Sequence, residues 1–449
     1  MNLVKALRIG ALPRLSFAGA GGKTTAMFRL ARQLPPPVLV TSTTHLATWQ
    51  IDLADNHIYL QKHLDQLKID DLINGHVNLV TGNTVEANRV AGLSPENLVR
   101  VFNFAEEGQV PLLIEADGSR QLPLKAPGEH EPPIPSFSDN VVVTAGLSAV
   151  GKPLSGALVH RAARFAQLSG LSSGDEITIE AISKVLKSPL GGSKNIPPRA
   201  RRVALLNQAD TPGLQASAHS LAKLLLPSFY SILISSLGPT AGSTQGVGRE
   251  VFAVHEPVAG ILLAAGGSNR LGEPKQLLPW KGRPMVYWVA KTALAAGMTP
   301  VVVVTGAYAQ GVERALAALP VTLVHNADWQ AGQSTSAQAG LRALPDEIGA
   351  ALFLLSDQPQ IPASLMRALV ETHAQTLAPI VAPMIDGQRG NPVLFDRITF
   401  AGFSTLDGDV GGRKLFSRYP VSWVDWHDRS LLLDVDNDED YRRLLELDC

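Results

Sequence analysis

Two glycine-rich segments, each directly after an apolar run that resembles a strand, carry residue types that handle phosphate groups. The second reads GILLAAGGSNRLGEPK over residues 260–275 and includes the cations Arg270 and Lys275. Backbone N–H groups of glycines can approach phosphate oxygens, and two spaced cations can neutralise the charge that builds on departing pyrophosphate. The segment therefore predicts a nucleoside triphosphate site with Arg270 and Lys275 as catalytic residues. The residues expected to contact the nucleotide are Ala265, Gly266, Gly267, Ser268 and Gly272.

The first glycine-rich segment is GAGGKTT, residues 19–25, and helical apolar spacing follows it directly. In a phosphate loop, Lys23 would reach the β- and γ-phosphates and the Thr24 hydroxyl would complete a Mg²⁺ shell, while the helix N-terminus favours anions. The standard pattern has a further glycine at the position of Phe17, so the segment departs from that form. It predicts a site for ATP or GTP, without distinguishing them. The expected contacts are Gly19, Gly21, Gly22, Lys23, Thr24 and Thr25.

Two later strand ends in the first half could complete this site. LLIEADGS (112–119) is an apolar run that ends in Glu115 and Asp117, where a carboxylate can hold Mg²⁺ directly or through water. We expect Asp117 to be the metal ligand. VALLNQAD (203–210) spaces Asn207 and Asp210 as in the N-K-x-D element, with which GTPases recognise guanine through the Asp. Gln208 stands where that element has lysine, which weakens the assignment of guanine. Each segment alone could equally be a solvated strand end. Together with the glycine loop they predict nucleotide binding.

Composition narrows the class of protein. The 449 residues carry 39 Lys+Arg against 40 Asp+Glu, and Cys449 is the single cysteine. This balance argues against a nucleic-acid partner, and one cysteine excludes disulfides within the chain and cysteine-based metal clusters. No stretch approaches the roughly 18 apolar residues of a membrane span, and the N-terminus does not resemble a signal peptide. We expect a cytoplasmic protein with no membrane partner.

The rhythm of short β-branched runs, glycine-containing loops and helical patterns occurs twice along the chain. Such uniformly apolar strands between helices indicate parallel sheets covered on both faces. We therefore expect the α/β class with two tandem domains, of which the first is a P-loop-type nucleotide-binding domain. The expected boundaries are 1–237 for the first domain, 238–257 for a linker and 258–449 for the second domain.

The first half resembles the YqeC family, putative accessory proteins of selenium-dependent molybdenum hydroxylases. The likeness rests on EADGSRQLPLKAPGEHEPPIP (115–135), together with GAGGKTT, TSTTH (41–45), Val159-His160-Arg161 and NQAD. It implies a nucleotide-dependent accessory activity, with an apo molybdenum hydroxylase as a candidate partner. A nucleotide-driven switch or chaperone is the alternative to an enzyme. Within this segment, Glu129, His130 and Glu131 could form a metal or substrate site, or equally a rigid exposed loop.

The second half resembles MobA-like nucleotidylyltransferases, most closely the molybdenum cofactor cytidylyltransferases, which implies a Rossmann-like nucleotidyltransferase domain. Beyond the glycine loop, the matching motifs are GQSTSAQAGL (332–341), LLSDQP (354–359), GQRGNPVLF (387–395), DGDVGGR (407–413) and DVDNDEDY (434–441). The resemblance implies that Asp357 holds the catalytic Mg²⁺, with Asp409 as a second metal contact and Asp434 as its rival. It places Ser334 and Ser336 at the nucleotide, and Gly390, Asn391 and Pro392 in the acceptor pocket.

The implied reaction is attack by the terminal phosphate of molybdopterin-type molybdenum cofactor on the α-phosphorus of CTP, with release of pyrophosphate. The Ala-Ala-Gly-Gly sequence favours cytosine by its resemblance to the cytidylyltransferases. The physics of the loop does not itself select a base. The alternative is a nucleotidylyltransferase that acts on a sugar phosphate or polyol phosphate.

Overall fold

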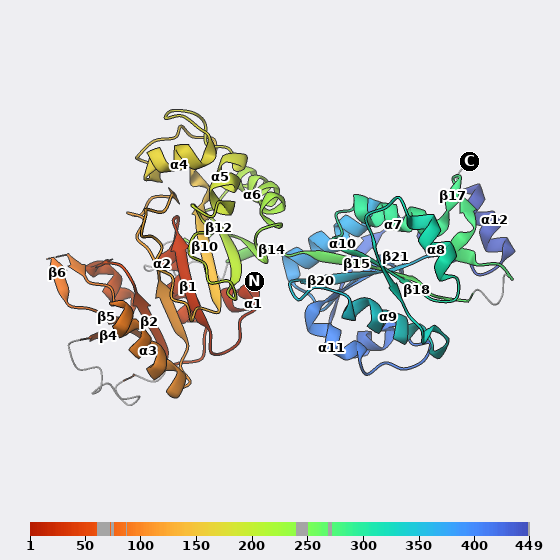
Figure 1. Ribbon diagram of the computed structural model, residues 1–449, viewed down its shortest axis with the longest axis horizontal. Coiled ribbons are helices and arrows are strands. Elements are labelled where there is room, and N and C mark those ends of the chain that lie inside the picture. Colours follow the sequence, from red (N-terminus) through yellow and green to blue (C-terminus); the bar gives the residue numbers. More distant parts are fainter. Residues whose placement is uncertain (61–71, 73–75, 87, 239–249, 268–271, 448–449) are drawn as a thin grey trace. The chain divides into compact units, whose positions relative to one another are not determined.

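The computed structural model describes residues 1–60, 72, 76–86, 88–238, 250–267 and 272–447. The chain divides into two compact units, Met1–His255 and Glu256–Cys449 (Figure 1). Each unit is built around one large sheet with helices packed against it, so the predicted α/β class is confirmed for both. Among the helices of the described residues, none has the length and apolar character needed to cross a membrane.

The sheet of the first unit is parallel except at one edge. Its strand order is β14-β13-β12-β10-β1-β8-β2-β5-β4, and only β14 runs antiparallel to its neighbour. The strands are buried along most of their lengths because β-branched and leucine side chains face helices on both sides. Their bounds are β1 Arg14–Gly19, β2 Val38–Ser42, β4 Asn56–Tyr59, β5 Val77–Thr81, β8 Leu112–Glu115, β10 Asn140–Gly146, β12 Arg201–Asn207, β13 Ser231–Ser235 and β14 Val251–His255.

The helices of the first unit begin with standard caps where the sequence supplies them. Ser94 caps α3 by accepting from the backbone N–H of Asn97, and Thr211 caps α6 in the same way through Leu214. The helices are α1 Leu3–Leu7, α2 Lys23–Ala31, α3 Pro95–Glu107, α4 Ala162–Ser169, α5 Ile179–Lys187 and α6 Pro212–Leu225. Two small sheets complete the unit, one of β3 Leu46–Ala47, β7 Arg89–Val90 and β6 Thr84–Glu86, the other of β9 Leu124–Lys125 and β11 Val159–His160.

Strand β14 changes the expected domain boundary. Val251–His255 lie in the segment 238–257 that the sequence suggested as a linker, yet they pair with β13 as the edge strand of the first sheet. The linker interpretation therefore does not hold for this strand, because its buried Val251, Ala253 and Val254 complete the core of the first unit. Residues 239–249 of the expected linker lie outside the described residues.

The second unit contains a mixed sheet, which corrects the expectation of a parallel one. Strands β19, β18, β15 and β20 are parallel, whereas β23 runs antiparallel to both β20 and β21. The sheet order is β19-β18-β15-β20-β23-β21-β22, and β24 pairs with β21. The bounds are β15 Val258–Ala264, β18 Val301–Thr305, β19 Thr322–His325, β20 Ala350–Leu355, β21 Ile380–Ile385, β22 Gln388–Arg389, β23 Val393–Asp396 and β24 Val421–Trp426.

Two hydrophobic clusters cover the faces of this sheet. Helices α7, α8 and α10 pack on one face, and α9 and α11 pack on the other (Figure 1). Their bounds are α7 Met285–Ala295, α8 Ala309–Leu316, α9 Gln333–Arg342, α10 Ala363–Thr376, α11 Phe400–Phe403 and α12 Asp438–Glu446, the last packing near the small hairpin of β16 Pro279–Trp280 and β17 Arg283–Pro284. The loops that follow the carboxyl ends of β15 and β20 contribute residues to a cleft.

Candidate functional site

A cleft of about 970 Å³ lies at the carboxyl ends of β15 and β20 in the second unit. Crevices at the carboxyl ends of parallel strands are where open α/β sheets bind ligands. Several residues predicted from the sequence line this cleft together, although they come from distant parts of the chain: Ala265, Gly266, Gly267, Lys275, Ser336, Asp357, Asn391 and Asp409. Ser268 and Arg270 lie outside the described residues.

Lys275 connects two acidic segments at one end of the cleft. Its ammonium Nζ lies 2.5 Å from Oδ2 of Asp357, which follows β20, and 2.9 Å from Oδ1 of Asp436. Burial acts to lower the pKa of Lys275, but the charges and hydrogen bonds of Asp357 and Asp436 outweigh it and raise that pKa. Lys275 is therefore a permanently charged group held in place beside the glycine loop.

Asp357 has a second oxygen that is available for a ligand. Its Oδ1 is buried and has no hydrogen-bond partner in the part of the chain that the structure describes. The nearby carboxyl of Asp434 accepts a hydrogen bond from the side chain of Gln358, and partial burial followed by the charge of Asp357 raises the pKa of Asp434 to about 6. Within the described part of the chain, no three His, Cys, Asp or Glu side chains form a ready metal-binding group. The geometry thus offers Asp357 as an oxygen donor, with Asp434 and Asp436 beside it.

The loop that carries Asp409 approaches the start of α9 closely. Gly332, just before α9, has a φ of +112°, and a Cβ at this position would lie 2.2 Å from the carbonyl carbon of Gly408. Only glycine allows this contact, which brings exposed Asp409 to the wall of the cleft. In the first turn of α9, the hydroxyls of Thr335 and Ser336 accept hydrogen bonds from the amide of Asn326, each at 2.9 Å. Ser336 is thereby oriented at the cleft wall.

The remaining predicted residues of this unit are not among those that line the cleft. Ser334 is buried, and its backbone N–H donates to the carbonyl of Gly408. None of the described residues forms a hydrogen bond with its hydroxyl. Gly390 packs against Ile385, and Gly390 and Pro392 flank Asn391 on the connection from β22 to β23. Gly272 lies before the 3₁₀ turn Lys275–Leu277 with a φ of +70°. Their assignment to the nucleotide and the acceptor stays a prediction.

Two arginines in the cleft were not assigned a role from the sequence. Arg389 lies 4.5 Å above the ring of Phe416, and both residues line the cleft together with Arg413. Burial and the nearby guanidinium of Arg413 lower the pKa of Arg389, which indicates that the two positive groups face a shared space. The signal was present in the GQRGNPVLF and DGDVGGR motifs, each of which contains one of these arginines.

In the first unit, the glycine loop holds its lysine inward. Lys23 is 3% exposed, and its ammonium donates to the carbonyl of Gly19 at 2.6 Å and lies 3.3 Å from Oδ1 of Asp117. Asp117 also accepts from the backbone N–H of Gly19 and pairs with Lys125 at 2.8 Å. Asp117 therefore meets two buried ammonium groups here.

The two residues predicted to hold a metal in this unit have different partners. The hydroxyl of Thr24 donates to Oε2 of Glu115 at 2.9 Å and accepts from the amide of Gln50 at 2.9 Å. Burial raises the pKa of Glu115, despite the nearby charge of Lys23. The carboxylate that contacts Thr24 is thus Glu115, the other acid at the end of this strand, while Asp117, the predicted metal ligand, pairs with Lys23 and Lys125.

Asn207 stabilises the glycine loop through a buried hydrogen bond. Its amide donates to the carbonyl of Gly21 at 2.8 Å, and its Oδ1 accepts from the Ser235 hydroxyl and the Leu237 backbone N–H. Asn207 is 1% exposed, so it holds the loop against β13. Asp210, predicted to read a base, accepts from the hydroxyl of Ser236. Thr25 lies in the first turn of α2.

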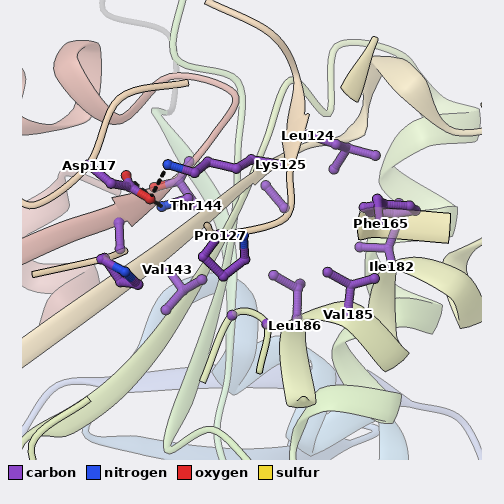
Figure 2. A pocket seen from close by; sticks show the side chains of 16 residues that line it. Asp117, Leu124, Lys125, Pro127, Val143, Thr144, Phe165, Ile182, Val185 and Leu186 are labelled. Atoms are coloured by element: carbon purple, nitrogen blue, oxygen red, sulfur yellow. Dashed lines mark hydrogen bonds and ion pairs between the residues drawn. The ribbon is translucent and has the colours of Figure 1, made fainter. Parts of the chain in front are cut away.

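The proline-flanked segment around Glu131 divides into an anchored and an exposed part. Glu129 and His130 are exposed, whereas Glu131 forms ion pairs with Lys125 and Arg161. Figure 2 shows Lys125 and Asp117 beside a small, mostly apolar cavity. The cavity of about 20 Å³ has about the room that one water molecule needs, and the buried, unpartnered hydroxyl of Thr144 lines it.

Comparison with known proteins identifies both halves. Residues 15–163 match the family described as YqeC protein, and residues 260–423 match the MobA-like NTP transferase domain. A protein of Escherichia coli strain K12 named "Uncharacterized protein YqeC" is 33% identical over 208 residues, which span 43% of this chain and 75% of that protein. The nicotine blue oxidoreductase of Paenarthrobacter nicotinovorans is 36% identical over 198 residues, 42% of this chain and 96% of that protein.

Two further similarities concern the transferase half. The purine catabolism protein PucB of Bacillus subtilis strain 168 is 31% identical over 194 residues, covering 40% of this chain and 93% of that protein. The crystal structure of Rv0371c from Mycobacterium tuberculosis H37Rv is 31% identical, covers 42% of this chain and 98% of that chain, and has a TM-score of 0.39. The chain therefore belongs to the YqeC family in its first unit and to the MobA-like NTP transferase family in its second, as a fusion of the two.

Proposed function

We propose that the second unit transfers CMP from CTP to the terminal phosphate of a molybdopterin-type molybdenum cofactor and releases pyrophosphate. The observation that carries the proposal is the charge arrangement of one cleft. Lys275 and Asp357 lie beside the glycine loop, while Arg389 and Arg413 line the same cleft with Asn391. A phosphate donor and a phosphate acceptor would thus each meet cationic groups of their own.

The donor side suits a nucleoside triphosphate. Lys275 supplies a fixed positive charge, and Gly266 and Gly267 line the same cleft, where their backbone N–H groups could donate to phosphate oxygens. Charge that develops on departing pyrophosphate would be stabilised by such preorganised donors without any reorganisation during the reaction. Arg270, which belongs to the same loop in sequence, is proposed as the second cation of this group. Ser336 on α9 would complete the donor wall.

The residues of the cleft fit a magnesium ion. Asp357 offers a buried oxygen, Oδ1, that has no hydrogen-bond partner among the described residues, and carboxylate oxygens are the ligands that Mg²⁺ prefers. We propose that Asp357 holds the ion, with Asp434, Asp436 or Asp409 supplying a further oxygen directly or through water. When bound, the ion would neutralise charge on the reacting phosphates. Lys275 would then keep its own contact with the phosphates as Asp357 turns to the metal.

The acceptor side suits a phosphomonoester. Guanidinium groups recognise phosphate through paired hydrogen bonds, and Arg389 is held over Phe416 within reach of the cleft. The two arginines would orient the acceptor phosphate for in-line attack on the α-phosphorus of the nucleotide. A sugar phosphate or polyol phosphate would meet the same arginines, and it is the second candidate acceptor for this reason.

For the first unit we propose nucleotide-dependent accessory work for selenium-dependent molybdenum hydroxylases, with an apo hydroxylase as its partner. The support is a strand, a glycine loop and a helix in direct succession. The amide of Asn207 donates to the loop carbonyl of Gly21, and the hydroxyl of Thr24 donates to the carboxylate of Glu115. ATP or GTP would bind at the start of α2, and Lys23 would turn from Asp117 toward the phosphates. A Lys23→Met chain that still binds Mg²⁺–nucleotide with wild-type affinity at this unit would contradict the phosphate-loop proposal.

Pyrophosphate release across ATP, GTP, CTP and UTP tests the proposal for the second unit. Each nucleotide is offered with molybdenum cofactor, with a polyol phosphate, or with no acceptor. We expect release with CTP and molybdenum cofactor together. Release with a polyol phosphate instead would favour the second candidate, and no release with any pair would contradict nucleotidyl transfer altogether. That last outcome matters because one relative of this unit is named an oxidoreductase.

A further inference from the structure

Asp117 in the first unit contacts two lysines at once, although a phosphate loop needs only one lysine. The ammonium of Lys23 lies 3.3 Å from Oδ1 of Asp117, and the ammonium of Lys125 lies 2.8 Å from Oδ2. Figure 2 shows the contact between Lys125 and Asp117. Each of the three side chains is at most 2% exposed, so these charges meet where water has little access.

The two lysines differ in their other contacts. The ammonium of Lys125 also lies 2.7 Å from Oε2 of Glu131 and donates to a backbone carbonyl at 2.6 Å, and its strand β9 pairs with β11. The ammonium of Lys23 donates to the carbonyl of Gly19 at 2.6 Å, and its contact with Asp117 is the longer of the two. Lys125 therefore has the shorter contact with Asp117 and a second ionic partner.

The charges around Asp117 stay paired when Lys23 is taken away. The two terminal nitrogens of Arg161 donate to the two oxygens of Glu131, each at 2.7 Å, and Glu131 contacts Lys125. A row of alternating positive and negative groups results, formed by Arg161, Glu131, Lys125 and Asp117. Each carboxylate in this row has a cationic neighbour without Lys23. Since a buried charge that loses its partner is costly, the row lets Lys23 move while Asp117 stays buried and paired.

We propose that Lys125 is a positioning residue that releases Lys23 for the nucleotide. When the Lys23 ammonium turns to the phosphates, Lys125 stays on Asp117 and keeps this buried carboxylate paired. Without Lys125, Lys23 would be the only cation within ion-pair distance of Asp117 among the described residues, and its departure would leave that carboxylate unpaired. The inference rests on the proposed nucleotide binding of the first unit and explains how Lys23 becomes available for it.

Nucleotide affinity of the full-length chain tests this role. The probe is the non-hydrolysable Mg²⁺–ATP or Mg²⁺–GTP analogue that the wild-type chain binds more tightly, and the binding that Lys23→Met abolishes is assigned to the first unit. We expect Lys125→Met to weaken that affinity roughly tenfold or more, because Asp117 then depends on Lys23 for its charge partner. Lys152→Met, at an exposed position of the same unit, is the matched control and should keep the wild-type affinity.

Two further measurements separate this role from a structural one. The matching nucleoside monophosphate lacks the β- and γ-phosphates that Lys23 would contact, so Lys125→Met should bind it as the wild-type chain does. Asp117→Asn removes the carboxylate charge, so adding it to Lys125→Met should restore the affinity for the triphosphate analogue. If Lys125→Met does not fold, Lys125→Gln takes its place, since glutamine keeps a hydrogen-bond donor for Asp117 without the charge.

Three results would overturn the inference: wild-type affinity of Lys125→Met for the triphosphate analogue, an equal loss of affinity for the monophosphate, or no recovery in the double variant. Weaker binding by Asp117→Asn alone would also contradict it, because Asp117 would then serve the nucleotide or its metal directly. All of these results leave nucleotide binding by the wild-type chain intact. Failure of the nucleotide proposal has a different signature, because the wild-type chain itself would then show no binding that Lys23→Met abolishes, and both proposals would fall together.

Discussion

The ammonium of Lys275 lies 2.5 Å from the carboxylate of Asp357, although 82 residues separate them in sequence. The contact joins the loop after β15 to the loop after β20, two parallel neighbours in the sheet. It makes Lys275 a charge whose position is fixed before any nucleotide binds. The pair therefore supplies the donor side of the cleft with one cation and one potential metal ligand.

Replacing Lys275 by alanine should lower the rate of nucleotidyl transfer strongly. Loss of one preorganised donor at developing charge typically costs about 10²–10³ in kcat. Single-turnover pyrophosphate release at saturating nucleotide measures this effect. Lys281→Ala is the control, since Lys281 lies over the ring of Trp280 outside the cleft. Equal rates in the two variants would remove Lys275 from the catalytic group.

Replacing Arg389 by methionine should act on the acceptor and not on the nucleotide. Hydrogen bonds to charged groups contribute about 1.5–3 kcal/mol, so the KM for the phosphorylated acceptor should rise roughly ten- to hundredfold. The KM for the nucleotide should stay close to its wild-type value. Steady-state kinetics with each substrate varied in turn separates the two, with exposed Arg397→Met as the control. A rise in the KM for the nucleotide alone would show that Arg389 binds the nucleotide and not the acceptor.

The carboxyl of Asp434 gives the second unit a pH-dependent stability. Partial burial and then the charge of Asp357 raise its pKa from 3.8 to about 6, so the folded state favours the protonated form. This favourable contribution is present at low pH and is lost as the pH rises through about 6. Asp434→Asn should therefore gain stability relative to wild type between pH 5 and pH 7.5.

Calorimetry of the full-length chain at both pH values measures the relative stability of the two proteins. Exposed Asp346→Asn is the control and should show no such change between the two pH values. A difference between Asp434→Asn and wild type that is the same at pH 5 and pH 7.5 would speak against the raised pKa.

Asn207 should matter for the stability of the first unit and for its glycine loop. Asn207→Ala leaves the buried carbonyl of Gly21 and the Leu237 backbone N–H without these partners, which costs about 1–3 kcal/mol. Chemical denaturation should report this loss, together with weaker nucleotide binding by the same chain. Asn103→Ala, at an exposed site on α3, should change neither quantity. An unaffected denaturation midpoint in Asn207→Ala would show that the loop does not depend on this contact.

The sequence predicted the elements that follow one simple rule. Loops after apolar strands of a parallel sheet gather at one edge, and this rule accounts for Lys275 and Asp357 lying in one cleft. It also predicted that each half of the chain is an α/β unit. The role of Asp357 itself came from the resemblance to MobA-like nucleotidylyltransferases. The rule does not predict that Arg389 lies in the cleft, because this residue is part of the short strand β22, which pairs antiparallel with β21.

Other features depended on contacts that no sequence pattern reveals. Lys23 matches a phosphate-loop lysine in sequence, but its inward orientation follows from Asp117, which lies 98 positions after Gly19 and accepts from its backbone. Asn207 was predicted to contact the nucleotide, and no sequence pattern reveals that its buried amide donates to the carbonyl of Gly21. Strand β14 could not be separated from the expected linker, because only its pairing with β13 shows that it belongs to the first sheet.

The most direct test of the proposed function follows the α-phosphate of the nucleotide. CTP labelled at its α-phosphorus is incubated with molybdenum cofactor, Mg²⁺ and either the wild-type chain or Asp357→Asn. We predict that the label moves to the cofactor with wild-type protein, in amounts equal to the pyrophosphate released, and that Asp357→Asn reduces this transfer at least a hundredfold, comparable with the loss of a preorganised charge-stabilising group. Full transfer by Asp357→Asn, or label that stays in CTP with the wild-type chain, would contradict the account.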